Sequence, residues 1–274
     1  MALMTVSEKG LVLLGCGKMG SAMLQGWLAD GLKPSSVYVL DPFPSEWLHE
    51  LEEKGLNLNK TLPQEPAVCI IAVKPQMMGE ALPSLKVIAR TDTVFLSIAA
   101  GTSIESFQSV LGKNCKIVRA MPNTPAAIGQ GISALIGNSN SSNQDIKLCE
   151  TLLQAVGDTV VLESESQMDA VTAVSGSGPA YVFHLIEALA AAGVDQGLSA
   201  QLAMKLAKKT VAGAGALAFH SEESPEQLRV NVTSPGGTTQ AALEILMDVE
   251  TGFPKVLLEG VKAAANRSKE LGKA

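Results

Sequence analysis

Two glycine-rich segments of this chain have the composition and spacing of anion-binding sites. Residues 15–20 read GCGKMG, which is the G-x-G-x-x-G spacing, and residues 232–239 read VTSPGGTT. Each directly precedes an apolar helical pattern. Because the free N–H groups at a helix start attract anions, both segments predict binding of a negatively charged group. An ordinary turn with Thr238 or Thr239 as helix N-cap would also explain the second segment.

The first segment fits a dinucleotide-binding fingerprint because of its surroundings. It follows the apolar run 11–14, which is typical of a buried strand, and it opens a helical pattern. In such a fingerprint Gly15 makes the tight turn, Gly17 lets the backbone approach a pyrophosphate, and Gly20 permits close packing of helix on strand.

Asp41 bears on the choice between two nicotinamide cofactors. It ends the apolar run 37–40, about twenty residues after the glycines, where a carboxylate accepts from the ribose 2′-hydroxyl of NAD and repels a 2′-phosphate. The next basic residue is Lys54. The sequence therefore predicts that NADH is used at least as well as NADPH, unless Asp41 merely starts an Asp-Pro turn.

Strand-like and helical patterns alternate through the first half of the chain, and helical patterns alone follow in the second half. Apolar strand-like runs predict a mostly parallel sheet with ligands beyond the strand C-termini; they cover 11–14, 37–40, 68–73, 94–99, 116–121, 132–136 and 159–162. After about residue 163 the strand signals end and alanine-rich helical patterns take over. We predict an α/β Rossmann-like domain over 1–163 and an all-α domain over 164–274.

The helical patterns of the second half are apolar on more than one face. They cover 167–174, 179–192, 199–220, 225–230, 238–249 and 254–271, with SGSGP at 175–179 as an interruption. Helices of this kind bury a face against another chain, which predicts an obligate homodimer or a larger ring of dimers.

Composition excludes several classes of function. The net charge of −6, scattered basic residues and 4% aromatics argue against a nucleic-acid partner, and no run is long enough to span a membrane. The four cysteines and three histidines lack metal-site spacing, so we expect no metal and a reduced, cytoplasmic location. No nucleophile motif or strong acid–base pair stands out, which suits hydride transfer to an already protonated imine.

Five motifs in one order make the chain resemble the pyrroline-5-carboxylate reductases over nearly its whole length. They are GCGKMG at 15–20, AVKPQ at 72–76, MPNTP at 121–125, VSGSGPAY at 174–181 and NVTSPGGTT at 231–239. The resemblance implies NAD(P)H-dependent reduction of 1-pyrroline-5-carboxylate to L-proline, the last step of proline synthesis. It also implies a homodimer with an interlocked helical domain that acts in substrate binding and dimerisation, often assembled into a decamer.

The resemblance also assigns roles to individual positions. Cofactor-binding positions are Gly15, Cys16, Gly17, Lys18, Met19, Gly20, Asp41, Asn59, Val73, Lys74, Pro75, Ala99 and Ala100, with the last two near the nicotinamide ring. Substrate-binding positions are Met121, Asn123, Glu222, Ser234, Gly237, Thr238 and Thr239. Thr239 is the catalytic candidate, because its hydroxyl is expected to align the ring nitrogen.

The sequence leaves two rival interpretations open. A β-hydroxyacid dehydrogenase of similar two-domain build would use a helical lysine as general acid, and Lys205, Lys208 and Lys209 are available. A cofactor-binding scaffold without turnover would bind NAD(H) but would not oxidise NADH when substrate is added.

Overall fold

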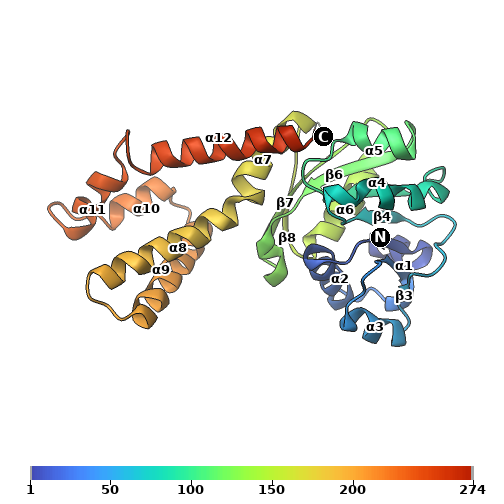
Figure 1. Ribbon diagram of the computed structural model, residues 1–274, viewed down its shortest axis with the longest axis horizontal. Coiled ribbons are helices and arrows are strands. Elements are labelled where there is room, and N and C mark those ends of the chain that lie inside the picture. The colour runs from blue at the N-terminus through green and yellow to red at the C-terminus, as the bar shows by residue number, and fades with distance from the viewer. Residues whose placement is uncertain (1, 273–274) are drawn as a thin grey trace. The chain divides into compact units, whose positions relative to one another are not determined.

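The computed structural model describes residues 2–272, which form two compact units (Figure 1). One unit contains the chain up to Gly176 together with the residues from Ala265 onward, and the other contains Ser177–Ala264. The predicted domain boundary after Glu163 marks the place where strand patterns end along the sequence. It stays a prediction, because the two units are defined by packing contacts and not by the end of the strand patterns.

An eight-stranded sheet forms the centre of the first unit. Its order is β3-β2-β1-β4-β5-β6-β7-β8, and every neighbouring pair is parallel except β6 and β7. The strands are β1 (Leu11–Leu14), β2 (Val37–Leu40), β3 (Asn57–Leu58), β4 (Val68–Ile71), β5 (Val94–Ser97), β6 (Lys116–Met121), β7 (Gly131–Gly137) and β8 (Gly157–Val161). The predicted Rossmann-like, mostly parallel α/β fold is confirmed.

Helices cover both faces of this sheet, as the unbroken apolar strands require. One hydrophobic cluster joins Met23 and Trp27 to Leu152, and the other joins Phe95 to Phe107. The helices of the unit are α1 (Ala2–Lys9), α2 (Lys18–Ala29), α3 (Glu46–Glu53), α4 (Met78–Ala81), α5 (Ile104–Leu111), α6 (Asn143–Gln154) and α7 (Met168–Val171).

Some sequence-based bounds were wrong in the first unit. The runs 68–73 and 94–99 leave the sheet at Ile71 and Ser97, because their last residues turn into the loops beyond the strand ends. The two-residue strand β3 was missed, since it is too short to carry an alternating pattern.

The second unit is entirely helical in the described residues. Its helices are α8 (Gly178–Asp195), α9 (Ala200–His220), α10 (Pro225–Asn231) and α11 (Thr238–Leu246), and α12 (Phe253–Leu271) runs from this unit into the first. The interruption expected at 175–179 is confined to Ser177, which lies between a π-helical turn over Thr172–Gly176 and the start of α8. The N-cap of α11 is Gly237, and this helix ends at Leu246, before the expected end near Val249.

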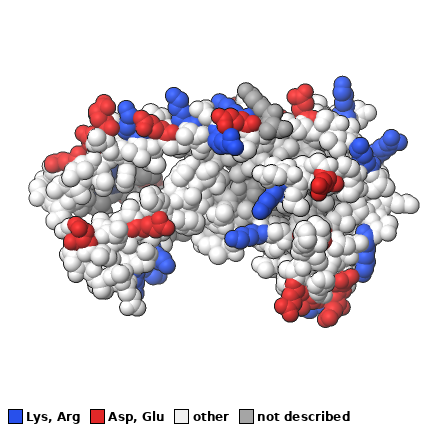
Figure 2. Space-filling view, viewed as in Figure 1, with Lys and Arg blue, Asp and Glu red and all other residues white. Residues whose placement is uncertain are grey.

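The helical unit buries very little apolar surface by itself. Its buried hydrophobic cluster consists of Ala190, Ala203 and Ala207, whereas Leu202 and Leu206 of α9 are nearly half exposed. Figure 2 shows much of this unit as uncharged surface, in contrast to the acidic patch over α3. In the described part of the chain, no helix is long and apolar enough to cross a membrane.

Candidate active site

The three glycines of the β1–α2 loop have different packing. A Cβ on Gly15, whose φ is +86°, would lie 2.7 Å from Val73 Cγ1, and one on Gly20 would lie 2.7 Å from the carbonyl oxygen of Gly15. A Cβ on Gly17 would meet nothing within 4 Å. Gly15 and Gly20 are therefore required by the fold, whereas Gly17 leaves open space beside the backbone.

The start of α2 offers unused backbone donors. Gly17 is the N-cap of α2, and no side chain caps this helix end. Lys18 is exposed and Met19 half-buried within the first turn. Free N–H groups beside open space fit a pyrophosphate.

Asp41 braces this loop. Its Oδ2 accepts from the backbone N–H of Cys16 at 2.7 Å, and its Oδ1 accepts from that of Phe43 at 2.8 Å. Asn59, in the left-handed region at φ 51°, clamps the Asp41 backbone with both ends of its amide at 2.9 Å. Each carboxylate oxygen can accept a further hydrogen bond, so the predicted ribose contact stays compatible with this bracing role.

Cys16 is buried within the same loop as a neutral thiol. Burial raises the pKa of Cys16 to about 11, and the nearby Asp41 carboxylate also raises it. The Ser21 hydroxyl, which donates to the Cys16 carbonyl oxygen at 2.9 Å, lies 3.6 Å from the sulfur. The side chain therefore packs as a small apolar group near neutral pH.

The remaining predicted cofactor positions follow the C-terminal ends of β4 and β5. Val73 and Ala99 are buried, Pro75 and Ala100 are half-buried, and Lys74 is exposed. Because β1, β4, β5 and β6 are parallel, these loops and the glycine loop lie at the same edge of the sheet.

The end of β6 contacts the π-helical turn. Asn123 accepts from the Ile132 N–H at 3.0 Å through Oδ1, and its Nδ2 donates to Ser175 Oγ at 3.3 Å. Met121 Cε occupies the place where a Cβ on Gly176 would be. The structure thus brings the MPNTP and SGSG motifs together, and π-turns are frequent at functional sites.

The Arg119–Glu165 ion pair was missed in the sequence. The Arg119 side chain is only 7% exposed, and its Nη1 donates to Glu165 Oε1 at 2.8 Å. The available signal was a charged residue within the apolar run 116–121, because a buried guanidinium requires a partner.

The loop before α11 is held by side chains of its own unit. The Gly236 N–H donates to Gln240 Oε1 at 2.7 Å, and no side chain caps the first turn of α11. Ser234 and Thr238 are exposed, and Gly237 and Thr239 are half-buried.

Glu223, the neighbour of the predicted Glu222, anchors the start of this loop. Its carboxylate accepts from Asn231 Nδ2 at 3.0 Å, whereas Glu222 is exposed. The role assigned to Glu222 stays a prediction.

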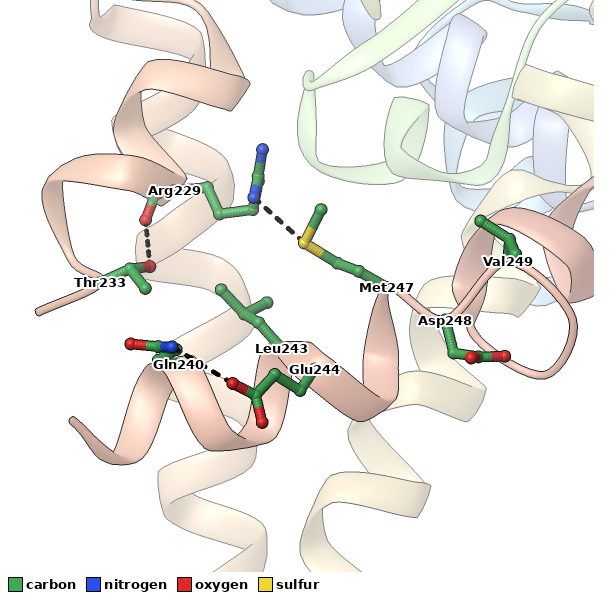
Figure 3. Close-up of a pocket in the computed structure, with 8 residues that line it drawn as sticks. All are labelled: Arg229, Thr233, Gln240, Leu243, Glu244, Met247, Asp248 and Val249. Atoms are coloured by element: carbon green, nitrogen blue, oxygen red, sulfur yellow. Dashed lines mark hydrogen bonds between the residues drawn. The ribbon is translucent and has the colours of Figure 1, made fainter. Parts of the chain in front are cut away.

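A cavity of about 490 Å³ opens beside this loop within the helical unit (Figure 3). Figure 3 shows Arg229 of α10 donating to Sδ of Met247 at the end of α11, and Gln240 donating to Glu244 along α11. Its lining residues are Arg229, Thr233, Gln240, Leu243, Glu244, Met247, Asp248 and Val249.

A glycine-rich β1–α2 loop, an acid at the end of β2 and a parallel sheet whose strand ends meet at one edge define a nicotinamide-dinucleotide-dependent oxidoreductase. Residues 165–271 match the family model for pyrroline-5-carboxylate reductase dimerisation, and residues 10–101 match that for coenzyme F420-dependent NADP oxidoreductase. The chain belongs to the pyrroline-5-carboxylate reductase family, and its reaction is the NAD(P)H-dependent reduction of 1-pyrroline-5-carboxylate to L-proline in proline biosynthesis.

Relatives and solved structures are similar to this chain over almost its whole length. The pyrroline-5-carboxylate reductase of Pseudomonas aeruginosa is 36% identical over 97% of this chain and 98% of its own, and that of Synechocystis is 39% identical over 96% and 98%. The structure of the Coxiella burnetii enzyme has a TM-score of 0.89 at 33% identity, covering 97% of this chain and 99% of its own. The Plasmodium falciparum structure with NADP bound has a TM-score of 0.83 at 31% identity, covering 97% and 99%.

Proposed function

We propose that the loop before α11 binds the substrate carboxylate. The observation that carries this proposal is the uncapped first turn of α11, a helix of nine residues that begins directly after Gly236-Gly237. The N–H groups of Thr238 and Thr239 are therefore available to an anion, and the hydroxyl of Ser234 adds a donor. Thr239 also directs its hydroxyl at the ring nitrogen, which aligns the imine for reduction.

The cofactor occupies the C-terminal edge of the sheet in this proposal. The β1–α2 loop holds the pyrophosphate, Asp41 and Asn59 lie at the adenosine ribose, Val73, Lys74 and Pro75 line the groove, and Ala99 and Ala100 lie at the nicotinamide end. When bound, NAD(P)H supplies the hydride for the C=N carbon. Met121 and Asn123 form the floor on which the substrate ring is placed. Positioning of this kind replaces a dedicated acid or base when the imine is already protonated.

NADH is used at least as well as NADPH. The Asp41 carboxylate accepts from two backbone N–H groups, and Asn59 holds the Asp41 backbone, so the carboxylate cannot swing away from a 2′-phosphate without releasing the Cys16 N–H. Steady-state kinetics with each cofactor test this. A kcat/KM for NADPH more than about tenfold above that for NADH, or about 1.4 kcal/mol, would contradict it.

The active form is a homodimer through the helical unit, and it can assemble further into a decamer. The exposed leucines of α9 and the family match to a dimerisation domain support self-association. The location is cytoplasmic, which suits four buried free thiols. Nucleic acid is no partner. On the face shown in Figure 2, surface patches that carry charges of one sign are small, such as the acidic patch over α3.

A further inference from the structure

Glu165 joins two segments of the first unit through a single oxygen. Its Oε1 accepts from Arg119 Nη1 at 2.8 Å and from the backbone N–H of Ile104 at 2.9 Å. Ile104 is the first residue of α5, where a carboxylate is favoured by the free N–H groups and the helix dipole. One carboxylate oxygen therefore links the start of α5 to the middle of β6.

Arg119 depends on this carboxylate. Its Nε is buried without a hydrogen-bond partner among the described residues, and Glu165 is the acidic side chain paired with it. A buried guanidinium that loses its carboxylate is strongly unfavourable. The two side chains therefore hold each other in place through the hydrogen bond between Arg119 Nη1 and Glu165 Oε1.

The two linked segments lead directly into the candidate active site. Arg119 precedes Met121 by two residues, so both side chains lie on the same face of β6. Loop 99–103 leads directly into α5, which begins at Ile104. In this loop, a Cβ on Gly101 would lie 3.0 Å from Leu271 Cβ. The loop is thus held between the ion pair and the end of α12.

We propose that Arg119 and Glu165 are positioning residues for hydride transfer. They fix the distance between loop 99–103 and the floor formed by Met121 and Asn123, without touching cofactor or substrate. This rests on the proposed placement of the nicotinamide at Ala99–Ala100 and of the substrate at Met121. A misplacement of about 1 Å costs on the order of 100-fold in rate, so a rigid link here governs kcat.

Three Glu165 variants separate geometry from charge. Glu165→Gln keeps Oε1 as an acceptor for both N–H groups. Glu165→Asp keeps the negative charge but is one methylene too short to reach both donors. Glu165→Ala removes the link. We expect Glu165→Gln to stay within about threefold of the parent kcat, and the other two to lose about 10- to 100-fold in kcat with smaller changes in KM.

Asp92→Asn is the matched control. Asp92 pairs with Lys116 Nζ at 2.6 Å, and Lys116 begins the same strand at the end away from the site. We expect Asp92→Asn to lower thermal stability slightly and leave kcat unchanged. Measurements on the full chain are steady-state kcat and KM for pyrroline-5-carboxylate, cofactor Kd by nucleotide fluorescence, and Tm.

The outcomes are separable. A lower Tm with unchanged kcat in Glu165→Asp and Glu165→Ala would make the pair merely structural and overturn the proposal, as would a Glu165→Gln variant as slow as Glu165→Ala. The site placement beneath it is tested by Ala100→Val in the otherwise unchanged protein. If that variant alters neither kcat nor cofactor Kd, the nicotinamide is elsewhere, and the placement fails whatever the Glu165 variants do.

Discussion

Asp41 illustrates how one side chain can serve the fold and the ligand together. Its carboxylate holds the glycine loop through the Cys16 N–H, and Asn59 holds Asp41 in turn. The sequence predicted the cofactor role from the position of the acid at a strand end. It could not predict the bracing, because Asn59 is eighteen residues away and its left-handed backbone is set by the fold.

At the residue scale, Thr239→Ala should lower kcat/KM for pyrroline-5-carboxylate about tenfold to a hundredfold. The change removes the hydroxyl that orients the ring nitrogen but leaves the helix N–H groups in place. Thr151 on α6 is half-buried like Thr239, and its hydroxyl donates to the Lys147 carbonyl oxygen, so Thr151→Ala serves as control. Equal kcat/KM in the two variants would remove Thr239 from the mechanism.

The burial of Cys16 makes the stability of the folded protein fall as the pH rises. Its folded pKa of about 11 lies above the ordinary value of 9.0, so the folded protein holds this proton more tightly than the unfolded chain does. Its contribution to stability is complete below pH 9 and is lost as pH rises through 11. Denaturant unfolding from pH 8 to 11 should therefore show a shallower decline for Cys16→Ser than for the parent. Parallel declines would show that this thiol does not titrate as its burial requires.

At the scale of elements, different glycines of the β1–α2 loop serve stability and cofactor binding. Gly20→Ala places a methyl group against the Gly15 carbonyl oxygen and should cost about 1–3 kcal/mol of stability. Gly17→Ala meets open space, so Tm should hold while the Kd for NADH rises at least several-fold. Thermal unfolding and fluorescence titration check both. A Gly17→Ala variant with parent affinity would place the pyrophosphate away from this loop.

Sequence patterns predicted elements better than they predicted their ends and cross-links. Apolar runs located seven of the strands, and the signal is clearest for β1, β4 and β5, which are buried along their whole length. The sequence predicted a helix over 167–174 and an interruption at 175–179, but it did not predict the π-helical turn at Thr172–Gly176, because glycine and serine are common in loops and in such turns. The Arg119–Glu165 link joins residues forty-six positions apart, a pairing that only the folded sheet creates. The sequence also predicted that a helix begins at the end of segment 232–239, and the structure places the N-cap of this helix at Gly237.

At the scale of the molecule, the helical unit should be unstable as a single copy. Its apolar side chains greatly outnumber those it buries, and exposed patches of this kind mark interfaces. Sedimentation velocity of the full chain should show a dimer or larger species. Leu202→Asp with Leu206→Asp should shift it toward monomer and lower activity, whereas Val87→Asp, an exposed apolar residue of the first unit, should not. A stable, active monomer would contradict the dimer.

The reaction central to every role above is the reduction of a small cyclic imine with hydride from a nicotinamide dinucleotide. Loss of absorbance at 340 nm from NADH or NADPH, followed with and without pyrroline-5-carboxylate, tests it most directly. We expect oxidation that depends on the imine and forms L-proline in equal amount. Cofactor binding without imine-dependent oxidation would contradict it.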